Sequence, residues 1–185
     1  MLRLASDAIR AADPDAVIVA GGLAPNTEAG GRNMSDVQFL REIYRRGASA
    51  YFDVVGAKPY GFWSGPYDRR VDPGALNYSR VILLREEMVR RGDGAKPIWG
   101  LEAGWAALPA DWAGAPSPQG ADTPDVQAQR LEMAIERFHR EWPWMGYLFI
   151  EHLQPDAPPD DPRVGFGLLS PAGEQTALHR ALREA

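Results

Sequence analysis

Four short apolar runs, each nearly continuous and separated from the next by a helical pattern, constrain the fold of this chain most strongly. They are "AVIVAGG", "YFDVVGAKPY", "KPIWGLEAG" and "WMGYLFIEHL", at residues 16–22, 51–60, 96–104 and 144–153. Each run is rich in β-branched or aromatic residues. Continuous hydrophobicity of this kind is typical of a strand that is buried on both faces of a parallel sheet. The sequence therefore predicts four buried parallel strands.

Amphipathic segments flank these strands, and their ends carry helix signals. Ser35, Thr123 and Ser170 stand at cap positions, the last two directly before a proline, which suits the first helical position. Gly47 and Gly92 follow arginine-rich last turns, where glycine adopts the left-handed conformation that ends a helix. The expected helices span about residues 2–12, 35–47, 75–92, 123–142 and 170–185. Alternation of strands and helices predicts one α/β domain, residues 1–185, with a parallel sheet.

Composition excludes several classes of function. The chain has 185 residues, a net charge of -5 and no cysteine, so thiolate metal sites, disulfides and cysteine nucleophiles are excluded. The mild acidity, without a basic cluster, argues against a nucleic-acid partner. No apolar run approaches the roughly 20 residues of a membrane span, and the first 15 residues lack the apolar centre of a secretory signal. The cellular compartment stays open.

No cofactor or metal is expected either. His139 and His179 lie on predicted helices without a second ligand at metal spacing. The glycine-rich stretches "AGGLAP" and "AGGRN" lack the lysine and the spacing of a phosphate-binding loop.

Two carboxylates stand where predicted strands end. Glu102 closes the third apolar run and Glu151 the fourth. The loops after strands are long, for example residues 106–122 and 154–167, whereas the turns after helices are short. Barrel and doubly wound enzymes build their sites from such loops, at the carboxyl ends of parallel strands. The alternative for Glu102 is a carboxylate that faces solvent or caps a neighbouring helix.

Four segments resemble one enzyme family, the glycoside hydrolases of the large retaining (β/α)8-barrel clan. "KPIWGLEAGWA" is similar to their seventh strand, "AYFDVVGAKPYGF" to the sixth, "AADPDAVIVAGGLAP" to the fifth, and "GFGLLSPAGEQTALHRAL" to the segment after the eighth. The resemblance covers the whole chain. It implies a TIM-barrel type fold of which only the C-terminal half, strands 5 to 8, is present. It also implies retaining hydrolysis of O-glycosidic bonds, with Glu102 as nucleophile.

The same resemblance implies an incomplete enzyme, because the Asn-Glu pair of the fourth strand, which supplies the acid/base glutamate, is missing from this chain. Glu151 is the best internal substitute, since adjacent strands lie about 4.8 Å apart. It departs from the family, which usually carries tryptophan there. Lys58 is a second departure, where histidine is common. A lysine there favours an ionised Glu102, or serves as structural neutralisation alone.

Further candidate residues for substrate binding surround these carboxylates in the sequence. Trp63 and Trp105 follow strands, where aromatic rings either stack on sugars or pack in the core. By family analogy Tyr60 hydrogen-bonds the nucleophile; otherwise it covers the strand end. His152 is either a substrate contact or a buried imidazole. Trp99 is expected in the core.

Two functional classes remain open. The chain is either the sugar-cleaving half of a barrel that depends on a second half, or a non-catalytic carbohydrate-binding or assembly module. Four strands cut from a barrel leave two unpaired edges and an uncovered apolar face. We therefore expect, besides a carbohydrate, a homodimer or a complementing N-terminal half as partner.

Overall fold

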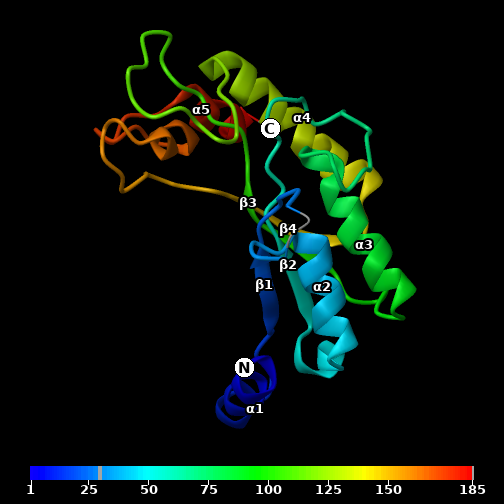
Figure 1. Cartoon of the computed structure of the whole chain (residues 1–185). Helices are drawn as coiled ribbons and strands as arrows, with labels where there is room; N and C mark the ends of the chain where they lie inside the picture. Colours follow the sequence, from blue (N-terminus) through cyan, green and yellow to red (C-terminus); the bar gives the residue numbers. More distant parts are fainter. Residues whose placement is uncertain (29–30, 185) are drawn as a thin grey trace.

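A four-stranded parallel sheet forms the centre of the computed structural model, which describes residues 1–28 and 31–184. The strands lie in the order β1-β2-β3-β4, so each pairs with its neighbour in sequence (Figure 1). Their bounds are β1 Val19–Leu23, β2 Val54–Ala57, β3 Ile98–Ala103 and β4 Met145–Ile150. All four predicted strands and their parallel arrangement are confirmed.

Helices alternate with the strands, as predicted. They are α1 Leu2–Ala12, α2 Asp36–Arg45, α3 Val81–Arg90, α4 Pro124–Glu141 and α5 Ala177–Glu184, with the 3-10 segments η1 Ala48–Tyr51, η2 Tyr78–Arg80 and η3 Pro162–Phe166. The Ser35 hydroxyl accepts a hydrogen bond from the Gln38 amide, and the Thr123 hydroxyl accepts one from the Val126 amide. Both predicted caps are therefore present, and each satisfies an amide that lacks a partner within its helix.

The helix ends also follow the sequence, with two exceptions. The helix expected from about residue 75 begins only at Val81, after the 3-10 segment η2. Gly47 and Gly92 have φ values of 68° and 82°, the left-handed conformation that glycine adopts without a steric cost. The closing helix, however, begins at Ala177 and not at Ser170. Ser170 is part of a tight turn, where its amide donates to the Glu174 carbonyl, while the Thr176 hydroxyl accepts from the His179 amide and caps the helix.

The main hydrophobic core lies between the sheet and helices α2, α3 and α4. Val55 and Ile98 are fully buried in the central strands, and they pack with Leu40, Leu84 and Ala134, one from each helix. The 3.6-residue spacing of apolar positions gives each of these helices one face for this core.

The opposite face of the sheet is open, which corrects one expectation. Tyr147 and Phe149 of β4 are 58% and 45% exposed, so the apolar run of β4 is not buried on both faces. Trp99, expected in the core, is only partly buried and packs its ring against both, at centroid distances of 4.8 and 6.3 Å. A continuous apolar run thus predicts that a strand forms, but it does not show that other elements cover both faces of that strand.

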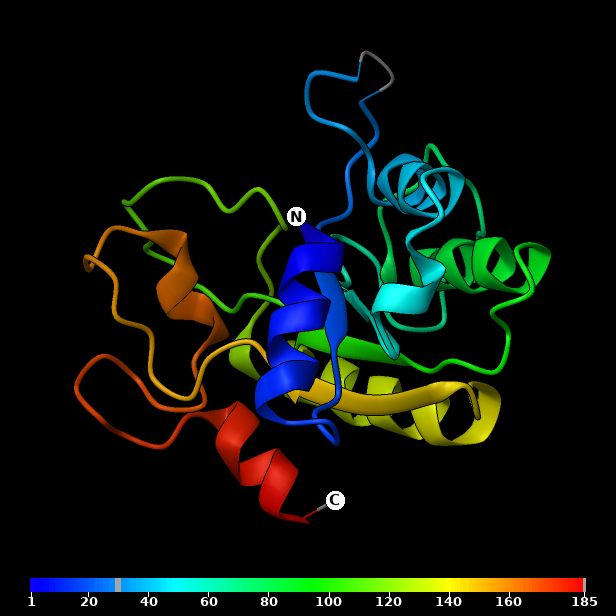
Figure 2. The same cartoon turned by 90° about the horizontal axis from the view of Figure 1, so that it is seen from below.

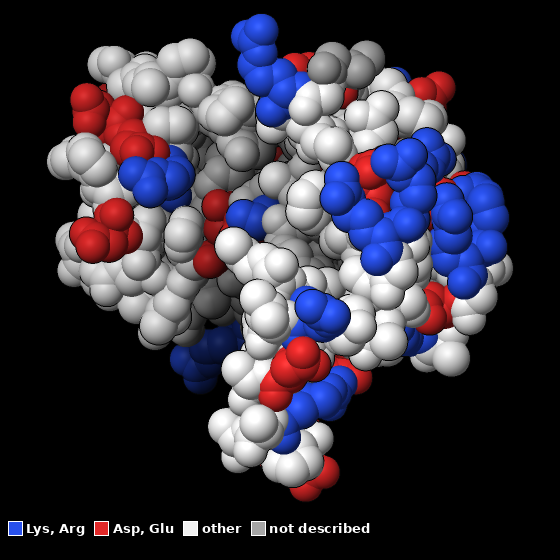
Figure 3. All heavy atoms as spheres, turned by 60° about the horizontal axis from the view of Figure 1, so that its bottom comes forward, with Lys and Arg blue, Asp and Glu red and all other residues white. Residues whose placement is uncertain are grey.

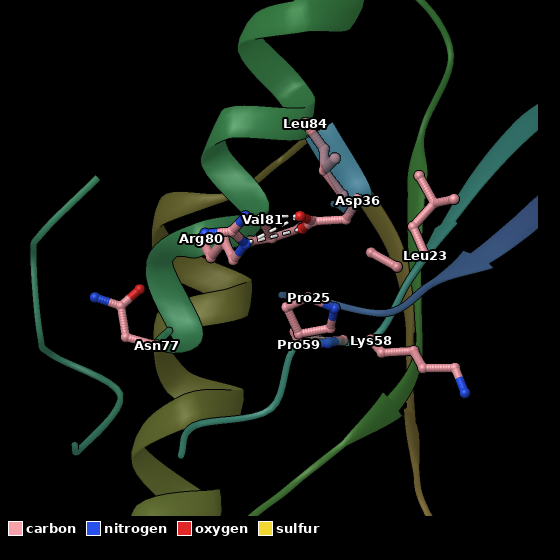
Figure 4. A pocket seen from close by; sticks show the side chains of 10 residues that line it. Leu23, Pro25, Asp36, Lys58, Pro59, Asn77, Arg80, Val81 and Leu84 are labelled. Atoms are coloured by element: carbon pink, nitrogen blue, oxygen red, sulfur yellow. Dashed lines mark hydrogen bonds and ion pairs between the residues drawn. The ribbon is translucent and has the colours of Figure 1, made fainter. Parts of the chain in front are cut away.

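A buried ion pair ties the long loops to the helical layer. Figure 4 shows the Arg80 guanidinium facing the Asp36 carboxylate from a neighbouring helix, with Nη2 to Oδ1 at 2.8 Å. Both side chains are 3% exposed. Arg80 also donates to the carbonyls of Asn26, Pro73 and Ala75, so its donors are well used and the two loops after β1 and β2 are fixed.

Arginines of the helical layer give one side of the surface a basic appearance. Figure 3 shows basic side chains gathered on the side of α2 and α3. Several are paired with carboxylates: Arg41, Arg90 and Arg91 bond to the buried Glu87, and Arg45 and Arg46 pair with Glu42. The patch is therefore partly neutralised.

The loops after β3 and β4 lie away from α2 and α3, as Figure 2 shows in green and in orange to red. Two backbone hydrogen bonds join these loops: the Ala107 amide donates to the Gly165 carbonyl at 2.9 Å, and the Ala115 amide donates to the Asp160 carbonyl at 3.0 Å. Among the described helices, none combines the length and the apolar character needed to cross a bilayer. The strand ends and these loops frame the candidate site.

Candidate functional site

The two predicted carboxylates meet at one tyrosine. The Tyr60 hydroxyl lies within hydrogen-bond distance of the Glu102 carboxylate, and it is 3.1 Å from Oε1 of Glu151. Because both carboxylates bond to the same oxygen, their nearest oxygens are separated by at most two hydrogen-bond lengths, about 6 Å. The carboxyl ends of β3 and β4 thus bring together two acidic groups that stand far apart in the sequence.

Lys58, the residue directly after β2, contacts the same cluster. Its ammonium Nζ lies 2.6 Å from Oε1 of Glu102, with the two side chains 26% and 31% exposed. Figure 4 shows Lys58 pointing away from the Asp36–Arg80 pair, so the two charged clusters lie on different sides of the strand end. Glu102 therefore has a dedicated counter-ion.

Backbone pairing at the strand ends fixes Tyr60. A parallel bridge joins Tyr60 to Gly104, and the Gly61 amide donates to the Gly104 carbonyl at 3.1 Å. The Trp105 ring lies directly on Gly61, where an added Cβ would sit within 2.0 Å of ring atoms. Only glycine fits beneath that ring, so the chain can turn there while Tyr60 keeps its direction.

The environments of the two carboxylates shift their pKa values in opposite directions. Burial alone would raise the pKa of Glu102, but the hydrogen bonds from Lys58 and Tyr60 together outweigh it and hold that pKa below its usual value. Burial raises the pKa of Glu151 to about 7, only partly offset by the Tyr60 bond and reinforced by the negative charge of Glu102. Near neutral pH the cluster thus pairs an ionised carboxylate with one that still holds its proton for much of the time.

Proton counting at Tyr60 agrees with this assignment. Burial and both carboxylates raise the pKa of Tyr60, so the hydroxyl stays protonated. A hydroxyl has one proton to donate but can also accept. Tyr60 can therefore donate to ionised Glu102 and accept from protonated Glu151 at the same time.

One oxygen of Glu151 is unused. Oε2 is buried and has no hydrogen-bond partner among residues 1–28 and 31–184, and the side chain as a whole is 9% exposed. His152 Nε2 lies 3.6 Å from the other oxygen, Oε1, and extends the cluster outward. A buried carboxyl oxygen without a partner is costly, and a ligand group bound there would remove that cost.

The two tryptophan candidates, Trp105 and Trp63, differ in exposure. Trp105 is 2% exposed and its indole donates to the Ser64 carbonyl at 2.8 Å. Its ring has no free face for a sugar, so for Trp105 the core alternative describes this structure and the substrate-contact alternative does not. Trp63 is 64% exposed in the loop after β2, and its ring lies close to Gly120. It alone of the two is open to a ligand.

Two phenylalanines, which the sequence patterns did not indicate, complete the site. Phe62 and Phe166 pack edge-on against the Tyr60 ring, at centroid distances of 6.1 and 5.9 Å. Phe62 has a φ of 54°, a left-handed conformation that is unfavourable for a bulky residue. Phe166 comes from η3, and no local signal connects that segment to Tyr60.

A hollow lies beside Tyr60, and Lys58, Glu102 and Glu151 do not line it. It measures about 470 Å³ and is lined by Tyr60, Phe62, Leu76, Pro25 and Gln119, among others, a size typical of small-molecule sites. On the face drawn in Figure 3, acidic and basic side chains lie next to each other in a central depression. Within residues 1–28 and 31–184, no group of three or more possible metal ligands occurs.

Comparison with known proteins connects this geometry to one fold. No protein-family model and no curated protein sequence matches the chain. Among solved structures, a family 39 glycoside hydrolase from Bacteroides cellulosilyticus matches 98% of this chain with a TM-score of 0.67 and 18% identity. A β-D-glucuronidase from Dictyoglomus thermophilum matches 98% with 0.53 and 18%, and one from Bifidobacterium dentium matches 99% with 0.50 and 16%.

The matched region is only part of those enzymes. The chain covers 36%, 28% and 26% of their respective lengths. The fold is therefore an α/β fold with four parallel strands that corresponds to part of a TIM-barrel glycoside hydrolase. This coarse form of the predicted fold class is confirmed.

Proposed function

We propose that this chain forms the strand 5 to 8 half of a retaining glycoside hydrolase, with Glu102 as nucleophile and Glu151 as general acid/base. One observation carries the proposal: two carboxylates share the Tyr60 hydroxyl while their pKa values are shifted in opposite directions. Retaining glycosidases need two carboxyl groups about 5 to 5.5 Å apart, one charged and one protonated. The fold likeness raises the expectation but does not by itself assign an activity.

In this mechanism the ionised Glu102 attacks the anomeric carbon of the sugar. The bond from that carbon to the leaving-group oxygen breaks, and the proton of Glu151 passes to this oxygen. Glu151 then takes a proton from water, whose oxygen displaces Glu102 from the sugar. Lys58 and Tyr60 keep Glu102 charged at the start, and the negative charge of Glu102 helps Glu151 to hold its proton until the leaving group departs.

The other candidate residues have supporting roles in the proposal. The exposed ring of Trp63 is suited to stack on a sugar, and His152 lies at the outer side of Glu151, where a substrate hydroxyl would approach. The substrate class is a glycoside or oligosaccharide. Assigning Glu151 as acid means that the second half of the barrel would supply walls and binding surface rather than this proton.

Hydrolysis of aryl β-glycosides tests the assignment. We expect Glu102→Gln to abolish turnover of every aryl glycoside, because an amide does not attack the anomeric carbon. We expect Glu151→Gln to slow a poor leaving group strongly and an activated nitrophenol much less, because a stable phenolate departs without a proton. Glu132→Gln, an exposed glutamate of α4, is the matched control and should keep the wild-type rate.

Unchanged rates in Glu102→Gln would rule out this nucleophile. If wild-type protein turns over no glycoside but binds one in an NMR titration, the chain is the non-catalytic carbohydrate-binding module instead. Equal slowing of both leaving groups in Glu151→Gln would remove Glu151 from the acid role while leaving Glu102 in place.

A further inference from the structure

The hollow beside Tyr60 shares this one residue with the carboxylate cluster. The Tyr60 ring lines the hollow, while its hydroxyl bonds to both Glu102 and Glu151. The hollow therefore lies one side chain away from the two carboxylates. The residues of its walls come from the loops after β1, β2 and β3, so three loops of this chain form it together.

The floor of the hollow is apolar and firmly held. Tyr60 and Phe62 are buried and belong to a second, smaller hydrophobic cluster, and Leu76 packs against it. Phe62 keeps its left-handed φ of 54° there, a conformation that persists for a bulky residue only where the surroundings fix it. Aromatic and aliphatic side chains of this kind suit the C–H face of a sugar ring.

The wall on the β3 side is a fixed turn. The Gly120 amide donates to the Ser117 carbonyl at 3.1 Å, and the Ser117 hydroxyl accepts from the Gln119 amide at 3.3 Å. Gly120 has a φ of 82°, and an added Cβ there would lie 2.7 Å from the Trp63 ring. Glycine thus lets the turn approach that ring, and the turn presents Pro118 and Gln119 to the hollow.

The wall on the β1 side is held by hydrogen bonds at Asn26. Its carbonyl accepts from Nη2 of the buried Arg80 at 2.9 Å. Its side-chain amide donates to the Met34 carbonyl at 3.2 Å, and its side-chain oxygen accepts from the Glu28 amide at 3.1 Å. With both walls fixed in this way, the hollow is already formed, which is usual for small-molecule sites.

The charge of the lining restricts the ligand. Among the described residues that line the hollow, none is lysine, arginine or histidine, and Glu28 is the one carboxylate. The other polar groups are the amides of Asn26 and Gln119 and the hydroxyls of Thr27 and Tyr60, which can bond to sugar hydroxyls. An anionic group bound there would lose water without gaining a counter-charge.

We propose that this hollow binds one uncharged pyranose ring, adjacent to the ring held at the carboxylates, and that it selects against uronic acids at this position. The floor packs on the face of the ring, and the amides of the two walls bond to its hydroxyls. The position next to the cleaved ring rests on the proposed function, whereas binding of a neutral sugar in the hollow can be measured without hydrolysis.

An NMR titration of Glu102→Gln, which should not cleave its ligand, tests the proposal with cellobiose, lactose and mannobiose. We expect at least one disaccharide to shift the Leu76 methyl and Gln119 side-chain signals and to show contacts between one sugar ring and the Leu76 methyls. A carboxylate in place of the primary hydroxyl of that ring should weaken binding about 10-fold or more.

A variant that fills the hollow provides the second arm. Ala24 is exposed and lines the hollow, so Ala24→Trp should weaken binding about 10-fold or more, because the indole takes the space of the sugar. Ala110→Trp is the matched control at an exposed loop position outside the lining and should bind like its parent. Gln119→Ala should weaken binding about 3-fold through one lost hydrogen bond, and circular dichroism checks the fold of each variant.

The proposal would be overturned if none of the three disaccharides shifted these signals, if the carboxylate derivative bound equally well, or if Ala24→Trp bound like its parent. Sugar binding in the hollow by a wild-type chain that hydrolyses no glycoside would support this inference and remove the proposed function. Hydrolysis without any binding in the hollow would do the reverse.

Discussion

Two charged clusters flank the second strand, and they are built differently. Behind the sheet, Asp36 and Arg80 are both 3% exposed, and Arg80 also donates to three carbonyls. At the strand ends, Lys58 and Glu102 are partly exposed, and the neighbouring Glu151 keeps a buried oxygen without a partner in the described part of the chain. The first cluster holds loops together. The second has unused bonding capacity, a counter-ion and two carboxylates with opposite pKa shifts, which are features of a site that awaits a ligand.

The largest effect is expected in the first cluster. Asp36→Ala leaves the Arg80 guanidinium buried without its counter-ion, which costs about 3 to 5 kcal/mol in the free energy of unfolding. Denaturant titration measures it. Asp111→Ala removes an exposed loop carboxylate and should change stability by less than about 0.5 kcal/mol. Equal effects of the two substitutions would contradict a structural role for the Asp36–Arg80 pair.

The second prediction concerns pH and Glu151. Its pKa is raised from 4.5 to about 7 in the folded protein, so between these values the native state binds more protons than the unfolded state. Stability therefore falls as pH rises through this window, by roughly 3 kcal/mol at 1.36 kcal/mol per pKa unit. Glu102, with a lowered pKa, acts oppositely: its contribution is lost as pH falls through its folded pKa.

Glu151→Gln should remove the decline of stability between about pH 4.5 and 7, because an amide does not ionise. Denaturant titrations at several pH values and one protein concentration measure it. Glu132→Gln, at an exposed position, should keep the wild-type pH profile. A wild-type profile in Glu151→Gln would show that another group titrates.

Removing the shared hydroxyl tests the link between the carboxylates. Tyr60→Phe deletes a hydrogen bond to a charged group, worth about 1.5 to 3 kcal/mol at neutral pH. It should raise the pKa of Glu102, since the Tyr60 bond lowers it, and it should change the pKa of Glu151, which loses its partner on Oε1. Carbon-13 NMR titration of the glutamate carboxyls measures this. Tyr67→Phe, which removes an exposed bond to Glu136, should leave both pKa values unchanged. Tyr60 would lose its bridging role if they stayed constant in Tyr60→Phe as well.

The smallest stability effect is expected at Lys58. Its pair with Glu102 is partly exposed, so Lys58→Met should lower the free energy of unfolding by only about 1 kcal/mol. The pKa of Glu102 should rise, because the Lys58 hydrogen bond contributes most to lowering it. Lys58→Arg keeps the charge and should preserve most of the lowered pKa. The same NMR titration distinguishes the two variants. An unchanged pKa in Lys58→Met would mean that Tyr60 alone keeps Glu102 ionised.

Local sequence signals predicted the ends of helices well where a single residue determines the end. Ser35 and Thr123 cap their helices and Gly47 and Gly92 end theirs, because each needs only its own turn. Ser170 was a wrong cap because its hydroxyl and amide bond to Glu174 in a turn, a competing local use of the same groups. The placement of Glu102 at a strand end was also predictable, because the apolar run at residues 96–104 shows both where the strand lies and where it ends.

The positions of the strands along the chain, the caps at Ser35 and Thr123 and the place of both carboxylates at strand ends follow from the amino-acid sequence itself, because periodicity and turn chemistry act over a few residues. Tertiary structure decided which groups meet. Tyr60, Glu102 and Glu151 come from three strand ends, and burial together with their mutual charges sets the pKa shifts. It also decided that Trp105 is enclosed and that Tyr147 and Phe149 are open, since exposure depends on which layer covers a strand and not on the strand's own residues.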